Sequence, residues 1–473
     1  MRRRSAAAVA LGAGLGCATN AFVAPSLRAA VRPGATAPKG VTATPGASSG
    51  AASATPTLCA TGALAAMAAA VTARQVPRKA GMKATATADA TRRGAAVEDC
   101  SGDNPAVCWP AGKPCYTTEY PEEYDLKDPK GSFKRVGKML LKEMIEELPE
   151  FYEMPQKEVD WVTRSLEYNT QGGKMNRGLI VVETGVAMLK HQGKTPTNAD
   201  LNRFAVLGWA VEFLQACMLM ADDMMDGSVT RRGAPCWYKL ENVGLLNTND
   251  FLMVEMFVYK IIKRHFGQEP YFLWLVDLFL ETTFQTEVGQ LLDSICANCE
   301  LEELDTTRWE LVVKYKTAFY SFYLPVALAM LVTGCRDRKA YDTSREALLL
   351  MGVYFQAQDD YLDAFASPEV LGKIGTDIAD KKCSWLFAHA YHEFSTPEGK
   401  AYLDEHYGKC KVGSDEEAEI KKLYTKLGLE DLFAKYEGEI EGKLAQYKER
   451  IEACDLPWSV FEMFFALIHK RSK

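Results

Sequence analysis

Apolar residues recur at helical spacing along most of the chain after about residue 134. Segments with apolar residues three or four positions apart are separated by short runs of Gly, Pro, Asn and Asp. This pattern predicts helices joined by loops, and no stretch shows the period-two alternation of a strand. The predicted helices cover 134–151, 157–170, 176–191, 199–226, 249–266, 270–294, 306–333, 343–366, 382–394, 416–452 with a break near Gly428, and 458–470.

Several of these helices exceed 20 residues and are apolar around much of their circumference. A helix of that kind must be buried inside a layered bundle. We therefore predict one all-α domain over residues 131–473. No run of 18 apolar residues occurs after residue 100, so no stable membrane span is expected in this part.

Residues 1–100 differ sharply in composition from the rest. They contain one aromatic residue, Phe22, and no acidic residue before Asp89, but ten basic residues from Arg2 to Lys83. The net charge of −7 is therefore +10 up to residue 88 and −17 after it. A segment with so few large side chains cannot bury a core. We assign 1–100 to a disordered targeting leader and 101–130 to a linker.

The leader has the order of features of a two-part address. A basic start, residues 1–4, precedes an apolar stretch at 6–17, as in a signal peptide. A long Ala/Thr/Ser/Pro-rich basic stretch follows, like a plastid transit peptide. This layout resembles the bipartite leaders of algae with secondary plastids, especially dinoflagellates, including their Phe-Val-Ala-Pro motif, here at 22–25. We expect a plastid location; the alternative is an alanine-rich tail with no address and a cytoplasmic enzyme.

Composition also argues against several classes of protein. The acidic folded part lacks the basic footprint of a nucleic-acid binder, and six histidines leave little material for a histidine metal cluster. The thirteen cysteines do not form the dense framework of a small secreted scaffold. The sequence assigns no role to Cys100, Cys108 and Cys115. Cys296 and Cys299 form a lone CxxC, which we interpret as structural.

Two aspartate clusters lie near the ends of long apolar helices, about 137 residues apart. In each, the first and last aspartates are four residues apart and share a helix face. Like charges at that spacing repel, so a cation is required. Hard oxygen ligands without His or Cys indicate Mg²⁺, which substrate phosphates typically complete. The clusters are Asp222-Asp223-Met-Met-Asp226 and Asp359-Asp360-Tyr-Leu-Asp363.

Basic residues lie where a polyphosphate would need them. Residues 171–177, Gln-Gly-Gly-Lys-Met-Asn-Arg, open a helix with glycines, cations and free N–H groups. Arg231 and Arg232 follow the first cluster, and Lys373 and Lys382 follow the second. Each alone could be an ordinary surface charge. Two metal sites and two anion sites around an apolar interior together describe an enzyme for a diphosphate with an apolar chain.

These residues closely resemble the short-chain trans-prenyl diphosphate synthases, especially the eukaryotic farnesyl type. The resemblance extends over roughly 134–473. It includes LEYN at 166–169, GGKxNRG at 172–178, DDMMDGSVTRRG at 222–233, CWY at 236–238, KYKTAFYSFYLP at 314–325, FQAQDDYLD at 355–363, GKIGTDI at 372–378 and KKCSW at 381–385. The family fold is a bundle of about ten core helices around a deep central cavity.

The resemblance implies an activity and its cofactor. The reaction would be the head-to-tail condensation of isopentenyl diphosphate with dimethylallyl or geranyl diphosphate to farnesyl diphosphate. Three Mg²⁺ ions, for which Mn²⁺ can substitute, would be held by Asp222, Asp223, Asp226 and Asp359. Asp360 and Asp363 would act largely through water or hydrogen bonds. The family forms homodimers.

The resemblance also implies which residues bind the substrates. The allylic diphosphate would lie against Arg231, Lys316 and Lys373, and Lys382 flanks the same site. Thr317, Gln356 and the Lys316 backbone would face the allylic carbocation. The basic residues 470–473 would close over the second substrate. Isopentenyl diphosphate would contact Gly173, Lys174, Arg177 and Arg232, with Gln215 close by.

One departure from the family pattern concerns product length. Farnesyl synthases of this type carry two aromatic residues at the fifth and fourth positions before the first aspartate, and these form the floor of the chain pocket. Here the positions hold Cys217 and Met218, which are smaller or more flexible. A product of 20 carbons, or a mixture of 15 and 20, is therefore the alternative.

Two other classes share parts of this pattern. Terpene cyclases and head-to-head synthases have an all-α cavity and an aspartate-rich motif, but they lack GGKxNRG with its basic site. A non-catalytic regulatory subunit usually loses one aspartate cluster, whereas both clusters are complete here. The sequence therefore favours a catalytic prenyl synthase.

Overall fold

The computed structural model describes residue 120 and residues 123–367 and 375–469. The chain divides into two units, Met1–Ala90 and Thr91–Lys473, and all described residues belong to the second. The predicted leader, most of the predicted linker, Lys373 and the basic end at 470–473 lie outside the described residues.

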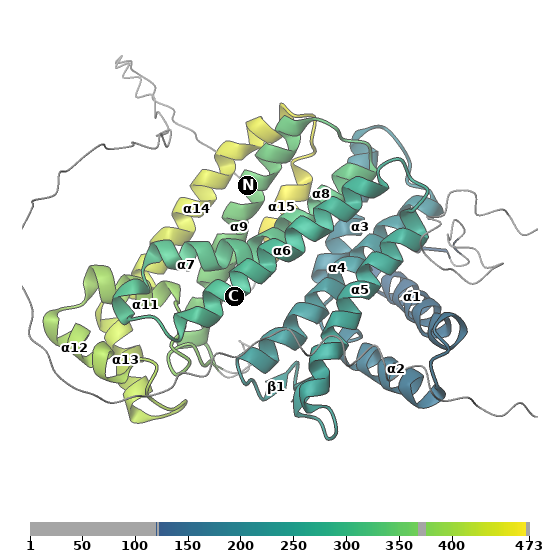
Figure 1. Ribbon diagram of the computed structural model, residues 1–473. Helices are drawn as coiled ribbons and strands as arrows, with labels where there is room; N and C mark the ends of the chain where they lie inside the picture. The colour runs from purple at the N-terminus through teal and green to yellow at the C-terminus, as the bar shows by residue number, and fades with distance from the viewer. Residues whose placement is uncertain (1–119, 121–122, 368–374, 470–473) are drawn as a thin grey trace, which may run out of the picture. The chain divides into compact units, whose positions relative to one another are not determined.

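The first half of the second unit packs around the long helix α4 (Figure 1). This helix begins at a capping box, in which Thr197 and Asp200 exchange side-chain and backbone hydrogen bonds. It packs against α3 and α5, and most of its side chains from Leu201 to Met220 are buried. The elements are α1 (Pro129–Phe151), α2 (Gln156–Thr170), α3 (Asn176–His191), α4 (Asn198–Met225), β1 (Thr230–Arg231), β2 (Ala234–Pro235), η1 (Trp237–Lys239), η2 (Gly244–Leu246), α5 (Asn247–Phe266) and α6 (Phe272–Cys296).

The second half packs around α9. Helix α14 and the π-helix η4 lie against α9, and η4 also lies against α6, which joins the two halves. The C-terminal helix α15 contacts both α3 and α9. The elements are η3 (Leu301–Glu303), α7 (Thr306–Val313), η4 (Lys314–Tyr323), α8 (Leu324–Val332), α9 (Arg338–Phe365), α11 (Trp385–His389), η5 (Ala390–Phe394), α12 (Pro397–His406), α13 (Asp415–Lys426), α14 (Leu429–Glu452) and α15 (Ser459–His469).

The all-α prediction is confirmed, and most predicted helices match observed ones closely. The break near Gly428 is present, because Gly428 adopts a φ of 72° between α13 and α14, a conformation that favours glycine. The sequence did not predict the short α12, the hairpin β1–β2, or the short turns η1, η2, η3 and η5. It also did not predict the π-helical turns of η4, which replace the middle of the helix expected over 306–333.

Among the residues that the structure describes, two helical stretches, Asn198–Met225 and Thr306–Val332, are long and apolar enough to cross a membrane. In both, 78% of the apolar window is buried inside the protein. Their apolar character is therefore explained by the two buried hydrophobic clusters of the bundle, one around α1, α4 and α5 and the other around α9, α11 and α14.

Candidate active site

The centre of the candidate site is a group of three carboxylates. Asp222 and Asp226 come from the end of α4, one turn apart, and Asp293 comes from the end of α6. One carboxylate oxygen from each lies within 4.8 Å of the others. The first two residues were predicted as neighbours, and Asp293 joins them through packing that the sequence pattern does not reveal.

Two lysine side chains bridge these carboxylates. Lys316 Nζ lies 2.9 Å from Asp222 Oδ1 and 2.6 Å from Asp293 Oδ2. Lys382 Nζ lies 2.9 Å from Asp226 Oδ2 and 2.8 Å from the same Asp293 oxygen. Asp293 is therefore the shared partner of both ammonium groups, and it ties η4 and the segment before α11 to the first aspartate cluster.

Charge pairing decides the ionisation of this group. Burial disfavours the charged forms, but the two lysines outweigh burial and hold the pKa of Asp222 and Asp293 below the ordinary value. Burial also works against the charge on Lys316, yet Asp222 and Asp293 raise the pKa of that ammonium group. These shifts favour the charged forms of Asp222, Asp293 and Lys316.

Asp226 differs from its neighbours in the same group. Burial and the negative charge of Asp222 raise the pKa of Asp226, and Lys382 only partly opposes them. Two carboxylates one helical turn apart thus repel each other, as the sequence predicted. Additional positive charge beside Asp226 would relieve this repulsion.

The donor set fits Mg²⁺. The three carboxylates offer only hard oxygen ligands, and their oxygens are close enough to share a cation. Burial and the repulsion between Asp222 and Asp226 raise the pKa of Asp226. A divalent ion bound here would neutralise the negative charge that causes this repulsion. Gln290 Nε2, 3.1 Å from Asp222 Oδ1, further fixes one of these carboxylates.

A close approach between α6 and the π-helix η4 positions Lys316 and Thr317. A Cβ atom on Gly289 of α6 would lie 2.0 Å from the Lys316 backbone nitrogen. On the other side of η4, a Cβ on Gly352 of α9 would lie 2.5 Å from Ala318 Cβ. The two glycines therefore allow α6 and α9 to pack closely against the π-helical turns. Turns of this kind are frequent at functional sites.

The second aspartate cluster is arranged differently from the first. Asp360 accepts hydrogen bonds from Trp309 Nε1, Gln356 Nε2 and the Trp385 backbone N–H, at 2.8, 2.9 and 2.8 Å. Burial raises the pKa of Asp360 to about 7. Its carboxylate lies outside the group formed by Asp222, Asp226 and Asp293. It instead fixes α9 to α7 and to the start of α11.

Asp363 likewise accepts hydrogen bonds from protein groups. The backbone N–H groups of Thr376 and Asp377 donate to it at 3.3 and 3.1 Å. Asp359 precedes Asp360 on α9, about 100° away around the helix. Within the second cluster, Asp360 and Asp363 thus have structural partners, in keeping with the hydrogen-bonding roles expected of them.

Two consecutive arginines point to different places. Arg231 donates to Asp223 Oδ1 from Nε at 3.0 Å and from Nη2 at 2.6 Å, and Nη2 also lies 3.3 Å from Asp222 Oδ2. Arg232 has a φ of 55° and turns toward the glycine-rich loop, where a Cβ on Gly173 would lie 3.1 Å from Arg232 Cζ. The hairpin β1–β2 thus connects the aspartate group to a second basic region.

That basic region contains Lys174, which is exposed, and Arg177. Arg177 Nε donates to Ser321 Oγ at 2.8 Å, and its guanidinium carbon lies 5.1 Å from the centre of the Tyr320 ring. In the orientation that satisfies its hydrogen bonds, the Gln215 amide oxygen accepts from Arg177 Nη1 at 3.0 Å. The structure therefore brings Gly173, Arg177, Gln215 and Arg232 into one region beside η4.

A buried carboxylate that the sequence pattern did not single out holds this region together. Glu212 Oε1 accepts from the Gly178 backbone N–H at 2.8 Å, at the start of α3, where the N-cap residue Met175 offers no side-chain cap. The Gln215 amide also donates to Glu212, at 3.3 Å. Burial raises the pKa of Glu212, although Gly178 and Arg177 favour its charged form.

Glu212 and Asp293 share one signal that was available in the sequence. Each is an acidic residue in the middle or last turns of a strongly apolar helix, where a charged side chain is buried only with a partner. The partner residues lie far away along the chain, so periodicity alone could not name them.

The positions predicted to set product length lie one turn before Asp222. Cys217 is buried, with 3% exposure, and Met218 is partly buried against the same hydrophobic cluster. Burial, together with Glu255 of α5 and Glu287 of α6, raises the pKa of the Cys217 thiol. This end of α4 therefore points its side chains toward α5 and α6.

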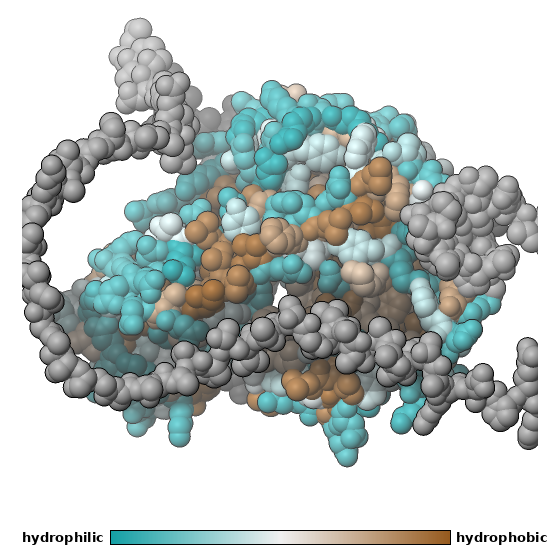
Figure 2. Space-filling model, viewed as in Figure 1, coloured by the Kyte–Doolittle hydropathy of each residue, from teal (hydrophilic) through white to brown (hydrophobic). Residues whose placement is uncertain are grey.

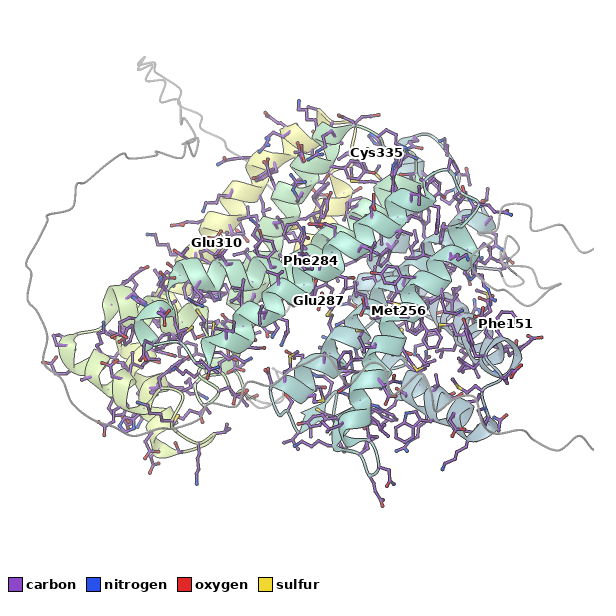
Figure 3. The ribbon with its side chains drawn as sticks, in the orientation of Figure 1. Phe151, Met256, Phe284, Glu287, Glu310 and Cys335 are labelled. Atoms are coloured by element: carbon purple, nitrogen blue, oxygen red, sulfur yellow. The ribbon has the colours of Figure 1, made fainter. Side chains whose placement is uncertain are left out.

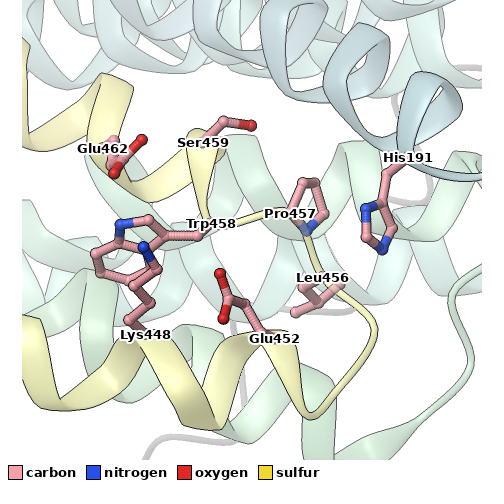
Figure 4. Close-up of a pocket in the computed structure, with 8 residues that line it drawn as sticks. All are labelled: His191, Lys448, Glu452, Leu456, Pro457, Trp458, Ser459 and Glu462. Carbon is pink, nitrogen blue, oxygen red and sulfur yellow. The ribbon is translucent and has the colours of Figure 1, made fainter.

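A separate cavity of about 410 Å³ lies elsewhere on the unit (Figure 4). It is bordered by His191 at the end of α3, Glu452 near the end of α14 and Trp458 before α15. None of the predicted site residues that the structure describes borders it. We place the candidate site at the carboxylate group because charge, donors and glycine contacts converge there.

Comparisons with known proteins agree with this geometry. A family model described as polyprenyl synthetase matches residues 159–427. The chain is 46% identical over 341 residues to a farnesyl pyrophosphate synthase of Candida albicans, covering 71% of this chain and 96% of that protein. It is 42% identical over 351 residues to farnesyl pyrophosphate synthase 2 of Arabidopsis thaliana, covering 74% of this chain and 100% of that protein.

The fold is also similar to solved structures. A structure of T. brucei farnesyl diphosphate synthase complexed with minodronate matches with a TM-score of 0.68 and 30% sequence identity. The match covers 73% of this chain and 100% of that one. Sequence and structure comparisons thus extend over nearly the full length of each relative.

Proposed function

The chain belongs to the polyprenyl synthetase family, and we propose that it condenses isopentenyl diphosphate head-to-tail with allylic diphosphates to give farnesyl diphosphate. The observation that carries this proposal is the group of Asp222, Asp226 and Asp293 bridged by Lys316 and Lys382. Beside it lies a second basic region, which a two-diphosphate reaction needs.

The allylic diphosphate would bind at the aspartate group. Bound Mg²⁺, held there by Asp222, Asp226 and Asp293, would neutralise the negative charge that develops on the departing pyrophosphate. Lys316, Lys382 and Arg231 supply fixed positive charge around the same place. We also propose that Lys373, which lies outside the described residues, contributes to this site.

The family resemblance assigns further metal contacts to the second cluster. We propose that Asp359 completes the binding of three ions, and that Asp223 orients Arg231 while adding negative charge to the same site. Mn²⁺ would replace Mg²⁺ as another hard divalent cation. Asp360 and Asp363 would support α9 through their hydrogen bonds rather than bind an ion directly.

Isopentenyl diphosphate would bind at the basic region formed by Gly173, Lys174, Arg177 and Arg232, with Gln215 and Glu212 fixing Arg177. The consecutive residues Arg231 and Arg232 then hold the two diphosphates on opposite sides of the reacting carbons. Binding of the two diphosphates in these two regions would bring the double bond of one substrate near the allylic carbon of the other, which is the main requirement of a condensation.

The residues of η4 and α9 would stabilise the positive charge on carbon. We propose that the Thr317 hydroxyl, the Lys316 backbone carbonyl and Gln356 face the allylic cation. Dipoles held in fixed positions are effective because they need not reorganise during the reaction. Loss of a proton to the departing pyrophosphate would then complete the reaction without a protein base.

The experiment is to incubate purified residues 115–473 with Mg²⁺ and isopentenyl diphosphate, offering dimethylallyl, geranyl and farnesyl diphosphates separately. We expect Mg²⁺-dependent release of pyrophosphate and a 15-carbon product. Extension of farnesyl diphosphate to 20 carbons would favour the alternative of a geranylgeranyl or mixed product. No product from any primer would reject the enzyme and leave a non-catalytic regulatory subunit.

We further propose that the enzyme is a homodimer formed through α6 and α5. Large apolar side chains are exposed along α6 at spacings of four and seven residues, which places them on one face, and Met256 of α5 lies beside them (Figure 3). Figure 2 shows an apolar band along α6. A second copy would cover this band by an isologous contact. Its members on α6 are Leu273, Leu280, Phe284, Leu291 and Ile295.

For location, we propose that residues 1–100 direct the enzyme to a plastid, with a cytoplasmic location as the alternative. Support comes from the order of the basic start, apolar stretch and acid-free region. A fluorescent protein fused behind residues 1–100 and expressed in an alga with secondary plastids should accumulate in that organelle. A diffuse cytoplasmic signal would reject the address.

A further inference from the structure

Lys382 reaches the carboxylate group from the short segment that precedes α11. Its Nζ lies 2.9 Å from Asp226 Oδ2 and 2.8 Å from Asp293 Oδ2. Burial works against the charge of this ammonium group, but Asp293 and Asp226 raise the pKa of Lys382 above its ordinary value. A lysine side chain has many rotamers, so its position in the site depends on how firmly its own backbone is held.

The backbone of Lys382 is held by hydrogen bonds on both sides. Its N–H donates to the Asp377 carbonyl oxygen at 3.0 Å, and its carbonyl oxygen accepts from the Ser384 N–H at 2.9 Å. The same carbonyl oxygen accepts from Tyr407 Oη at 2.6 Å. The first two bonds are local, whereas Tyr407 is the C-cap residue of α12, 25 residues further along the chain. Tyr407 therefore fixes this peptide relative to a distant element.

The side chain of Tyr407 is itself held in place. It is 0% exposed, and its ring stacks on that of Phe387 in α11 with the ring centres 4.0 Å apart. Burial raises the pKa of Tyr407 well above its ordinary value, so the hydroxyl keeps the proton that it donates. Tyr407 is therefore a rigid hydrogen-bond donor to the Lys382 backbone.

Lys381 holds the same segment from the other side. Its Nζ donates to the Cys299 carbonyl oxygen, just after α6, at 2.6 Å. Its φ is 55°, a strained conformation for a lysine, which persists only where the surroundings hold the residue and which is common at functional sites. Its side chain passes over Gly408, which has a φ of 77° or less in the same left-handed region and where a Cβ would lie 2.4 Å from Lys381 Cβ.

We propose that Tyr407 and Lys381 are positioning residues, which hold the Lys382 backbone so that its ammonium group stays on Asp226 and Asp293 and binds the allylic diphosphate. The identity of that substrate rests on the function proposed above, whereas the positioning of Lys382 does not. Neither side chain belongs to the carboxylate group, so each acts through Lys382. Helix α12, which the sequence did not predict, then contributes to the site through the residue that ends it.

Tyr407→Phe tests the first contact, because it removes the hydroxyl and keeps the ring. Isothermal titration calorimetry of the purified full-length chain with inorganic pyrophosphate and Mg²⁺ measures diphosphate binding without any reaction. We expect the Kd to rise about tenfold, the order of effect of one lost hydrogen bond. KM for the allylic diphosphate should rise in parallel, with kcat less affected and KM for isopentenyl diphosphate unchanged.

Tyr391→Phe is the matched control. Tyr391 is 3% exposed, and its ring stacks on the same Phe387 with the centres 5.2 Å apart. Its hydroxyl donates to Glu302 and Asp404, which are not part of the carboxylate group. This variant should lose a similar amount of stability in urea unfolding and keep the wild-type Kd for pyrophosphate. A rise equal to that of Tyr407→Phe would overturn the proposal, because both changes would then act by loosening the fold.

A double-mutant cycle with Lys382→Met shows whether Tyr407 acts through Lys382. Lys382→Met should itself raise the Kd for pyrophosphate. In that background Tyr407→Phe should add nothing to the Kd, although its cost in unfolding stability should remain, because residues that act on one group are not additive. The same further rise in both backgrounds would overturn the proposal.

Lys381→Met tests the second contact, and it also decides the matter if Tyr407→Phe folds poorly. Methionine keeps an unbranched side chain over Gly408 but cannot donate to the Cys299 carbonyl oxygen. We expect a rise in Kd of about tenfold, which should again disappear in the Lys382→Met background. A wild-type Kd in either single variant would overturn the role of that residue.

The positioning and the proposed function fail in different ways. Pyrophosphate binding that follows this pattern in a chain without prenyl transfer would count against the proposed function alone. Prenyl transfer by Tyr407→Phe with the wild-type KM for the allylic diphosphate would count against the positioning alone.

Discussion

Gly289 of α6 and Lys316 of η4 approach each other so closely that a Cβ on Gly289 would lie 2.0 Å from the Lys316 backbone nitrogen and 2.4 Å from its Cα. Both atoms belong to backbone, so neither can rotate away. The contact fixes the position of the π-helix along α6. It also brings Lys316 Nζ to Asp293 on the same helix, 2.6 Å away.

We therefore expect Gly289→Ala to displace η4. Overpacking of this kind costs about 1–3 kcal/mol of folding stability, and a shift of Lys316 and Thr317 should lower kcat by about 100-fold. Denaturant unfolding and steady-state kinetics measure the two effects. Gly438→Ala in α14 is the matched control, because a Cβ there meets nothing within 4 Å and alanine favours a helix by about 0.5–1 kcal/mol. Equal behaviour of the two variants would contradict the prediction.

Asp293→Asn tests the carboxylate that both lysines share. We expect kcat to fall by about 100-fold, with a higher Mg²⁺ concentration needed for half-maximal rate, because one charged ligand and one anchor for two lysines are lost. Activity measured across a Mg²⁺ titration checks both effects. Asp277→Asn, on an exposed turn of the same helix, should leave the titration unchanged. A wild-type titration for Asp293→Asn would remove this residue from the site.

The fold was predictable from the sequence because helical periodicity is a local property. Helix α3 matches its predicted range of 176–191, and the glycine break at Gly428 marks the boundary between α13 and α14. The π-helix η4 was not predictable, because it depends on the contacts of Gly289 and Gly352 with a segment distant in sequence. The pattern of apolar and polar residues in η4 does not reveal these contacts with distant glycines.

The candidate site divides in the same way. Asp222 and Asp226 could be paired from their spacing alone, since one helical turn fixes their relation. Asp293 and Glu212 could not be paired with anything, because each meets its partners only after distant helices pack. The sequence motifs thus identified Asp222 and Asp226, which belong to one helix. Only the structure shows which side chains from other helices pair with Asp293 and Glu212.

Glu212→Gln tests the buried carboxylate of the second basic region. Loss of its charge weakens the support of Arg177, and an uncompensated partner of this kind costs about 1–3 kcal/mol. We expect KM for isopentenyl diphosphate to rise about tenfold, with a smaller change in KM for the allylic substrate. Glu183→Gln, also on this side of the bundle in α3, should change neither value. An equal rise in both KM values would instead indicate general misfolding.

Glu212→Gln should also change how the stability of the protein depends on pH. Burial raises the pKa of Glu212 above its ordinary 4.5, so the folded state holds this proton more tightly than the unfolded chain. The contribution of Glu212 to stability is therefore greatest below pH 4.5 and declines as the pH rises through the raised pKa. Glutamine cannot titrate, so the stability of Glu212→Gln relative to wild type should improve as the pH rises from 4.5. A relative decline over that range, measured by urea unfolding, would contradict this sign.

Phe284→Arg tests the proposed dimer. Phe284 is 63% exposed in the middle of the apolar band on α6, and a charge there would be buried without a partner in the contact. We expect dimerisation to weaken by at least about 2 kcal/mol, so that sedimentation at micromolar concentration shows mainly monomer. Val412→Arg, an exposed apolar residue between α12 and α13, should remain dimeric. A wild type that sediments as a monomer would reject the dimer itself.

Product length depends on what the growing chain meets beyond Asp222. Cys217 and Met218 lie one turn before that aspartate, and Cys217 is almost fully buried. Replacing both with phenylalanine adds volume at this place, at a cost of about 1–3 kcal/mol in stability where the site is already packed. We expect the double variant Cys217→Phe/Met218→Phe to refuse farnesyl diphosphate as a primer and to give only 15-carbon product.

Chromatography of the products from geranyl and farnesyl primers measures this directly. The double variant Cys217→Ser/Met218→Leu nearly preserves side-chain volume and should therefore give the wild-type product. This control distinguishes an effect of side-chain size from an effect of any change at these two positions. If wild type extends farnesyl diphosphate and the phenylalanine variant still does so, these positions do not form the floor of the pocket. If wild type already stops at 15 carbons, another group must stop the chain, and the charged side chains to examine are Glu255 and Glu287, which act on the Cys217 thiol from α5 and α6.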